Sequence, residues 1–188
     1  MPSTDAMAAP GSPAPQGSAT QPADATPTAN AANPTQRSKA KENRRQALLT
    51  AAASLFAMNG FNRVSLEDLG AAAGVSGPAV YRHFPGKQAV LADLLASVSR
   101  ELLQGGRRVV DTSPDPETAL RRLVASQVDF AVGKPDVIRV QDRDLSNLSE
   151  EDQATVRALQ RSYVELWVDV LAQLQPGTDS SELRMRAH

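Results

Sequence analysis

The chain has 188 residues, of which 41% are hydrophobic and 4% aromatic, and its formal net charge at pH 7 is −1. It contains no cysteine, which excludes disulfides, thiolate zinc sites and cysteine nucleophiles. No apolar run approaches the roughly 20 residues that span a bilayer, and the N-terminus lacks the pattern of a signal peptide, so we expect a cytoplasmic protein without membrane contact.

Residues 1–37 are predicted to form a disordered tail. The segment consists mainly of Ala, Pro, Ser and Thr, and it holds seven of the thirteen prolines but almost no large apolar side chain. Such a composition cannot bury enough surface to offset the entropy that is lost on ordering. We assign no function to this tail.

A small helical module is predicted to follow the tail. Apolar residues recur at helical spacing up to Gly60, a typical stop after a helix. Ser65-x-x-Asp68 is a helix-start signature, and Ser76 is expected to cap a further helix that has Pro78 in its first turn. The module covers residues 38–86, with helices expected at residues 40–59, 66–73 and 77–83.

Residues 87–188 are predicted to form a second helical module. A long helix starts at Lys87 and carries a broad apolar stripe, and the pair Gly105-Gly106 is expected to end or bend it. Further helices are expected at residues 116–132, 135–145 and 150–175, and another begins near Ser180. No segment has the pattern of a strand, so the predicted fold class is all-α.

The second and third helices have the arrangement of a helix-turn-helix, in which the later helix enters the major groove of DNA. Small side chains at its start would let the backbone approach base edges, and Pro78 and Ala79 could meet thymine methyl groups. Hydroxyl and cationic side chains around it would bind phosphates. The candidate DNA-binding residues are Arg44, Arg45, Ser65, Ser76, Gly77, Pro78, Ala79, Tyr81, His83 and Lys87.

Several of these residues also have a purely structural interpretation. Tyr81 could be a core aromatic, the two neighbouring arginines could lie on a solvated face, and Ser65 is first a helix cap. The charge distribution favours DNA, because residues 37–87 carry eight Lys or Arg against three acids, whereas residues 88–188 carry twelve against sixteen. A basic module before an acidic one indicates polyanion binding by the first.

Three motifs follow one another over about residues 41–90: Ala52-x-x-Leu55-Phe56-x-x-x-Gly60-Phe61, then Val64-Ser65-Leu66-x-x-Leu69-x-x-x-Ala73, then Gly74-Val75-Ser76-x-x-x-Val80-Tyr81-Arg82-His83-Phe84-x-Gly86-Lys87. Together they resemble the DNA-binding domain of TetR-family transcriptional regulators. The resemblance implies an all-α homodimer, with an N-terminal three-helix helix-turn-helix domain and a C-terminal helical domain for ligand binding and dimerisation. It also implies a repressor that leaves a palindromic operator in double-stranded DNA when a small-molecule effector binds.

The resemblance extends to single residues. The family's phosphate contacts fall on Tyr81, His83 and Lys87, and its base-reading positions fall on Ser76 to Ala79. The family's last two helices pair across a two-fold axis, and this chain stops where the first of that pair would begin. Either the C-terminal domain is truncated or the dimer forms differently.

The C-terminal helices are expected to enclose a pocket for a small lipophilic or acyl-type ligand, because few cations interrupt their apolar stripes. The usual interpretation of such a stripe is core packing, so residues with a polar handle are the better candidates. Asp142-Arg143-Asp144 is expected to be a solvated turn or a surface ion pair. The candidate ligand-binding residues are Leu94, Val98, Gln127, Phe130, Tyr163 and Trp167.

Catalysis is not expected. The only histidines are His83 and His188, and the sequence has no Gly-rich phosphate loop, metal-ligand cluster or H-E-x-x-H motif, so no cofactor and no metal are predicted. Two alternatives stay open, a helical adaptor that does not bind DNA and an activator that uses the same DNA-binding domain. A steep loss of affinity with salt would separate a DNA-binding protein from a neutral adaptor.

Overall fold

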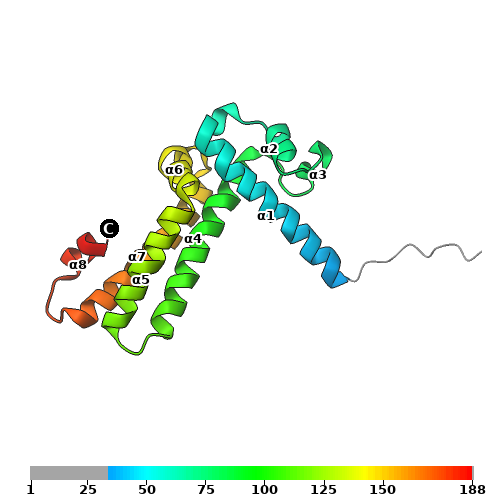
Figure 1. Ribbon diagram of the computed structural model, residues 1–188. Coiled ribbons are helices and arrows are strands. Elements are labelled where there is room, and N and C mark those ends of the chain that lie inside the picture. Colours follow the sequence, from blue (N-terminus) through cyan, green and yellow to red (C-terminus); the bar gives the residue numbers. More distant parts are fainter. Residues whose placement is uncertain (1–33, 188) are drawn as a thin grey trace, which may run out of the picture. The chain divides into compact units, whose positions relative to one another are not determined.

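The computed structural model describes residues 34–187, which form helices joined by short turns (Figure 1). In chain order the elements are α1 (Pro34–Asn59), the 3-10 helix η1 (Phe61–Arg63), α2 (Leu66–Ala72), α3 (Gly77–Tyr81), α4 (Lys87–Asp111), α5 (Pro116–Gly133), α6 (Pro135–Asp144), the 3-10 helix η2 (Leu145–Asn147), α7 (Glu150–Leu174) and α8 (Ser180–Ala187). No strand occurs in this part of the chain, and the all-α prediction is confirmed. None of these helices is long and apolar enough to cross a membrane.

Helices α1, α2 and α3 pack around a small apolar core. Phe56, Leu69 and Val80 come one from each helix and have no exposed surface. The predicted helix start is confirmed, because Ser65 and Asp68 form a reciprocal capping box at the beginning of α2. The three helices are therefore held together by a shared apolar core, and α2 is also fixed by a local cap.

Two glycines allow α3 to lie close to α2. Gly74 has a φ of +65°, in the left-handed region that favours glycine, and it makes the turn after α2. A Cβ on Gly70 would lie only 2.8 Å from the carbonyl oxygen of Val75 and 2.9 Å from Cγ2 of Val80. The missing side chain at Gly70 therefore determines how closely α3 approaches α2.

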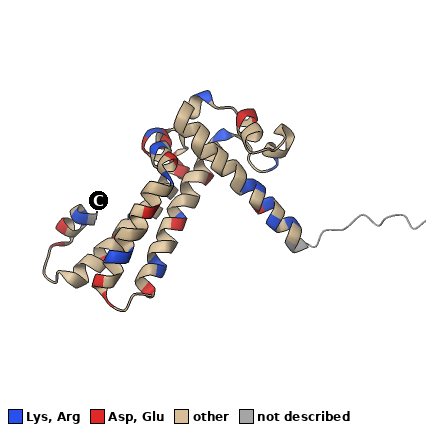
Figure 2. Ribbon diagram, in the orientation of Figure 1, with Lys and Arg blue, Asp and Glu red and all other residues tan. Residues whose placement is uncertain are grey.

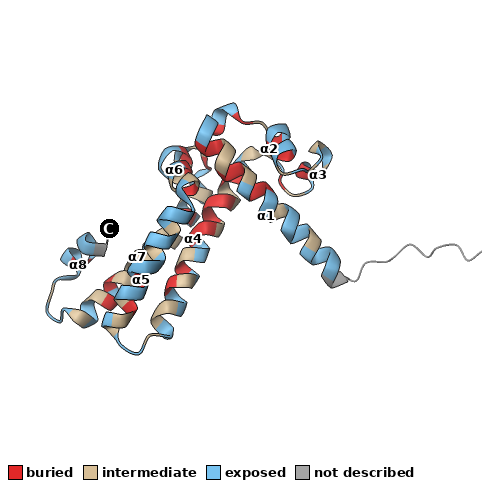
Figure 3. Cartoon of the chain, viewed as in Figure 1, coloured by how far each residue is buried: buried red, intermediate tan, exposed pale blue. Residues whose placement is uncertain are grey.

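Helix α4 connects this module to the remaining helices and packs against α1, α5 and α7. One buried cluster is continuous through α1 to α4 and includes Val140 of α6 and Val156 of α7 (Figure 3). A smaller cluster, around Leu123 of α5 and Val170 of α7, lies apart from it. The apolar core therefore continues past residue 86, where the sequence suggested a boundary between two modules.

Two helix ends differ from the prediction. Helix α1 begins at Pro34, within the segment assigned to the tail, and the rest of that assignment, residues 1–33, lies outside the described residues. Helix α4 passes through Gly105-Gly106 and continues to Asp111. A Cβ on Gly106 would lie 2.9 Å from Cε2 of Tyr163, so this glycine permits close packing of α4 against α7 and does not end the helix.

Candidate nucleic-acid interface and ligand cavity

The first turn of α3 is open to solvent. Ser76 is the N-cap residue as predicted, but its side chain is exposed and makes no capping hydrogen bond. Pro78 is exposed, Gly77 and Ala79 are half-buried, and no atom lies within 4 Å of a Cβ built on Gly77. The four predicted base-reading residues thus form a surface of small groups that includes a serine hydroxyl without a capping partner.

Tyr81 and His83 border this surface. Tyr81 is 55% exposed, so the core interpretation of this residue is wrong, and its hydroxyl donates to the carboxylate of Glu67 over 3.5 Å. His83 is half-buried, and its Nδ1 has no hydrogen-bond partner among residues 34–187. Burial and the charges of four nearby cations lower the pKa of His83, which favours a neutral imidazole.

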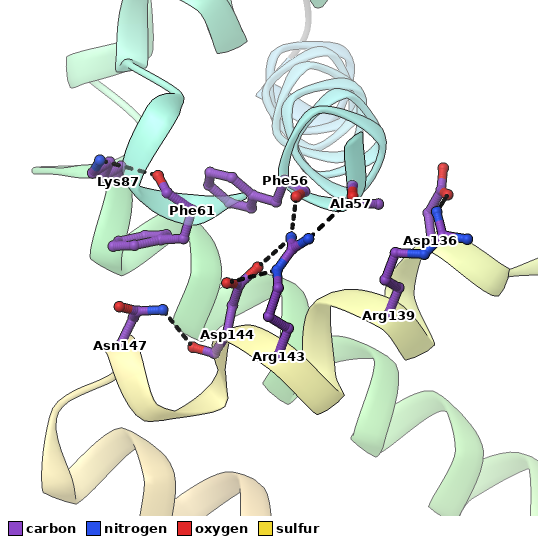
Figure 4. A network of polar contacts seen from close by, with 9 residues as sticks. All are labelled: Phe56, Ala57, Phe61, Lys87, Asp136, Arg139, Arg143, Asp144 and Asn147. Atoms are coloured by element: carbon purple, nitrogen blue, oxygen red, sulfur yellow. Dashed lines mark hydrogen bonds and ion pairs between the residues drawn. The ribbon is translucent and has the colours of Figure 1, made fainter. Parts of the chain in front are cut away.

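Lys87 is engaged within the protein. Its Nζ donates to the carbonyl oxygen of Phe61 at 3.1 Å (Figure 4) and lies 4.6 Å from the centre of the Phe61 ring. It also donates to the carbonyl oxygens of Asn62 and Val64, both at 3.2 Å. An ammonium group has three protons, and these carbonyls accept all three. Lys87 therefore fixes the loop after α1, a role that differs from the phosphate contact that the resemblance implied.

The two predicted arginines have different surroundings. Arg45 connects α1 to α4 through an ion pair of 2.5 Å with Asp93, whereas Arg44 is exposed and forms no ion pair within residues 34–187. Ser65 is half-buried, and its hydroxyl accepts from the backbone N–H of Asp68 at 3.1 Å and donates to the carboxylate at 2.7 Å. The backbone N–H of Ser65, which donates to the Asp68 carboxylate at 2.9 Å, lowers the pKa of Asp68, and the bond from the Ser65 hydroxyl to the same carboxylate lowers it further. Arg44 is thus the more available cation of the pair.

Sequence reasoning missed a polar hollow between α1 and the residues that follow α3. It has a volume of about 400 Å³ and is lined by Ser38, Lys41, Glu42, Arg45, Arg82 and His83. The available signal was the i, i+3, i+4, i+7 spacing of the four α1 residues, which places them on one helix face. Nothing in the sequence showed that Arg82 and His83 would face them.

A cavity of about 560 Å³ lies between α4, α5, α6 and α7. Four of the six predicted ligand-binding residues line it: Gln127, Phe130, Tyr163 and Trp167. Tyr163 donates its hydroxyl hydrogen to Oε1 of Gln127 at 3.0 Å, and its ring meets Trp167 edge-on with centroids 6.1 Å apart. Burial raises the pKa of Tyr163. Missed lining residues are Ser99, Leu102, Val137, Gln141, Asp142, Gln160 and Val164.

The other two predicted ligand-binding residues, Leu94 and Val98, lie elsewhere. They are 4% and 6% exposed and form part of the main core. They also line a separate cavity of about 290 Å³ between α1, α4 and the start of α6. Both residues belong to the apolar stripe of α4. The spacing of that stripe in the sequence does not indicate which of the two cavities each of its residues faces.

Arg143, near the end of α6, holds the C-terminus of α1 (Figure 4). Its guanidinium donates to the carbonyl oxygens of Phe56 and Ala57, and to the carboxylate of Asp144 at 2.8 Å. A cation satisfies the unpaired carbonyls at this end of a helix and is favoured by the helix dipole. Asp144 is only 4% exposed, so the expectation of a solvated turn or surface pair is wrong for it.

Two family models match the chain. "Bacterial regulatory proteins, tetR family" matches residues 48–94, and "Tetracyclin repressor-like, C-terminal domain" matches residues 113–184. The first match contains α2 and α3, and the second contains α5, α6 and α7. The two matches therefore include the helix-turn-helix and three of the four helices around the larger cavity.

Individual proteins agree with these matches. The chain is 26% identical over 145 residues to the HTH-type transcriptional repressor KstR2 of Rhodococcus jostii, covering 76% of this chain and 71% of that protein. It is 35% identical over 82 residues to the HTH-type transcriptional regulator EthR of Mycolicibacterium smegmatis, covering 43% of this chain but only 38% of that protein. A TetR-family transcriptional regulator from Bordetella parapertussis has a similar structure, with a TM-score of 0.70, 28% identity and coverage of 78% of this chain and 77% of that chain.

Proposed function

Because the chain belongs to the TetR family of bacterial transcriptional regulators, we propose that it represses transcription from a palindromic operator until a small molecule releases it. The DNA-binding module is the helix-turn-helix of α2 and α3. The family match does not favour the alternative of an adaptor that does not bind DNA. The name of the relative KstR2, a repressor, supports repression over activation.

The open first turn of α3 supports base recognition through small groups. Pro78 and Ala79 offer apolar surface to thymine methyl groups, and the hydroxyl of Ser76 can bond to a base edge or a phosphate. The exposed Tyr81 is suited to donate to a phosphate oxygen. Since few polar groups lie on this turn, shape and methyl contacts carry most of the specificity that we propose.

We assign the effector to the cavity between α4, α5, α6 and α7. Its volume of about 560 Å³ falls within the range of small-molecule sites. Phe130 and Trp167 provide apolar walls, the Tyr163–Gln127 pair provides polar groups, and Asp142 is the only charged residue among those that line it. A carboxylate-binding cation is thus missing from the lining, which favours a neutral or amphipathic ligand of lipophilic or acyl type.

The observation that carries the proposal is that α6 lines the cavity and also contacts α1 of the DNA-binding module. Its residues Val137, Ile138 and Gln141 line the cavity, and Arg143, less than one turn later, holds the C-terminus of α1. A ligand that displaces α6 would displace α1 and therefore the orientation of α3. The protein then leaves DNA because the ligand binds the displaced arrangement of α6 and α1 more tightly than the DNA-bound arrangement.

A two-step experiment tests this function. Genomic fragments retained by the purified chain should share a palindrome whose half-sites lie one helical turn apart, about 34–36 Å, as a dimer requires. Lipophilic metabolites are then screened for release of those fragments, with Trp167→Leu as a variant that should still bind DNA but resist release. Fragments without a common palindrome would contradict the operator, and equal release of the variant would contradict the cavity assignment.

The remaining parts of the proposal follow from this function. We propose a homodimer, which sedimentation of the purified chain can test, and a cytoplasmic location, where the chromosome of a bacterium lies. We propose no enzymatic activity and no cofactor. A reporter gene under the selected operator distinguishes repression from activation by the sign of its response.

A further inference from the structure

Helix α1 extends well beyond the apolar core. From residue 36 onward the first buried residue of α1 is Leu48, where the family match also begins, whereas α1 itself begins at Pro34. Between residues 36 and 47 every side chain is exposed except those of Ala40 and Arg45, which are half-buried. At 1.5 Å per residue, the fourteen residues 34–47 form an extension of about 21 Å. This extension does not serve the core.

The extension is basic and borders the recognition helix. It carries five Lys or Arg and one acid, and Figure 2 shows these cations along the outer half of α1. One face of it, with Lys41 and Arg45, forms the polar hollow together with Arg82 and His83. Because these last two residues directly follow α3, the hollow adjoins the surface that reads DNA.

The hollow has an excess of positive charge. Arg45 is paired with Asp93 at 2.5 Å and with Glu42 at 3.5 Å, but neither Lys41 nor Arg82 forms an ion pair within the described part of the chain. After the effect of burial, the cations around His83 lower its pKa further, as expected where the local potential is positive. Cations that converge without carboxylate partners favour an anionic ligand.

We propose that this hollow binds a phosphodiester group of DNA just outside the base pairs read by α3, and that the α1 extension follows the flanking backbone. The inference rests on the proposed function for its DNA, but it adds contacts from α1 residues that precede the family match, which starts at residue 48. An extension of about 21 Å corresponds to roughly six base pairs at 3.4 Å each. The partner is the backbone, so this contact adds affinity without sequence preference.

The chain offers a matched pair of variants. Lys41→Gln removes one cation from the hollow, and Lys39→Gln makes the same substitution two residues away, about 200° around the same helix. Affinity is measured by fluorescence anisotropy against NaCl concentration on three duplexes: the selected operator with ten flanking base pairs on each side, the operator trimmed of its flanks, and a flanked duplex of scrambled sequence. Glu42→Gln removes a carboxylate from the hollow, so its effect on DNA affinity should be opposite to that of Lys41→Gln.

The plot of log K against log salt has a negative slope, and each lost phosphate contact makes that slope shallower by about 0.9. We expect Lys41→Gln to make the slope shallower by that amount per protomer on both flanked duplexes. On the trimmed duplex it should leave the slope unchanged. Lys39→Gln should match the wild type, and Glu42→Gln should bind the flanked duplexes more tightly. A purely structural role of Lys41 would not produce a dependence on flank length.

The outcomes distinguish this inference from the proposed function. Equal slopes for Lys41→Gln and Lys39→Gln on the flanked duplexes would overturn the phosphate site, as would an equal loss on the trimmed operator. A wild-type chain that prefers neither operator nor scrambled sequence would contradict the proposed function alone, because the two variants can still be compared on the scrambled duplex.

Discussion

Lys87→Met tests whether this lysine stabilises the fold or binds DNA. The substitution keeps most of the aliphatic stem and removes the ammonium group. In the structure that group donates to the carbonyls of Phe61, Asn62 and Val64 and lies over the Phe61 ring. Methionine can replace the packing of the stem but none of these hydrogen bonds.

The expected loss can be worked from those contacts. The bonds to Phe61 and Val64 are partly buried, and each contributes about 1 kcal/mol, whereas the bond to Asn62 is exposed and contributes little. The contact with the aromatic ring adds about 0.5 kcal/mol. The variant should therefore lose about 2.5 kcal/mol of unfolding free energy, which for a domain of this size lowers Tm by about 5–10 °C.

Urea denaturation and the salt dependence of DNA binding are the two assays. Lys39→Met, an exposed lysine on α1, is the control for loss of one charge and should keep the wild-type midpoint. For Lys87→Met we expect a lower unfolding midpoint and an unchanged salt slope below the unfolding temperature. An unchanged midpoint with a slope shallower by about 0.9 would refute the structural role and restore the phosphate contact.

Three further perturbations follow from the packing and the buried polar groups. Gly70→Ala should cost about 1–3 kcal/mol, because its Cβ would meet backbone. Gly105→Ala should instead gain about 0.5–1 kcal/mol, because within its helix the new Cβ would meet only the end of the Arg108 side chain, at 3.9 Å. Urea midpoints that move in the same direction would contradict this account. Arg143→Met should cost about 2–3 kcal/mol of unfolding free energy, because it leaves the buried Asp144 carboxylate unpaired. Adding Asp144→Asn should recover part of this loss. Additive losses of the two substitutions in thermal unfolding would argue against the pair. Burial raises the pKa of Tyr163 above its ordinary value of 10.0, so its contribution to stability is complete below that pH and is lost as the pH rises through the folded pKa. Ultraviolet titration of the wild type against Tyr163→Phe should assign to Tyr163 an ionisation above pH 10.0, and an ionisation at or below that value would be inconsistent with its burial.

The helices and most of their ends could be predicted because their signals are local. The capping box of Ser65 and Asp68 and the left-handed Gly74 act within one or two turns of the chain. The small residues of α3 could also be placed on an open surface, since Val80 alone in that turn is a large apolar residue. The helix-turn-helix is thus encoded in about 25 consecutive residues, at a scale where periodicity and caps decide the structure.

The roles of individual cations could not be predicted in the same way. Lys87 was expected at DNA because a basic residue at a helix start is a general phosphate-binding signal. Whether its charge points outward depends on three carbonyls that lie 23 to 26 residues earlier. Arg143 depends on carbonyls 86 and 87 residues away. Side-chain partners at such separations cannot be predicted from the spacing of residues within one segment.

The amino-acid sequence by itself determined an all-α chain with a helix-turn-helix, because apolar periodicity, caps and glycine stops act between near neighbours. The tertiary structure decided which faces of these helices meet. It brought four of six predicted ligand residues to one cavity and placed Leu94 and Val98 in another. It also used Gly106 for contact with α7. These outcomes depend on how helices distant in the chain pack together, which no single segment contains.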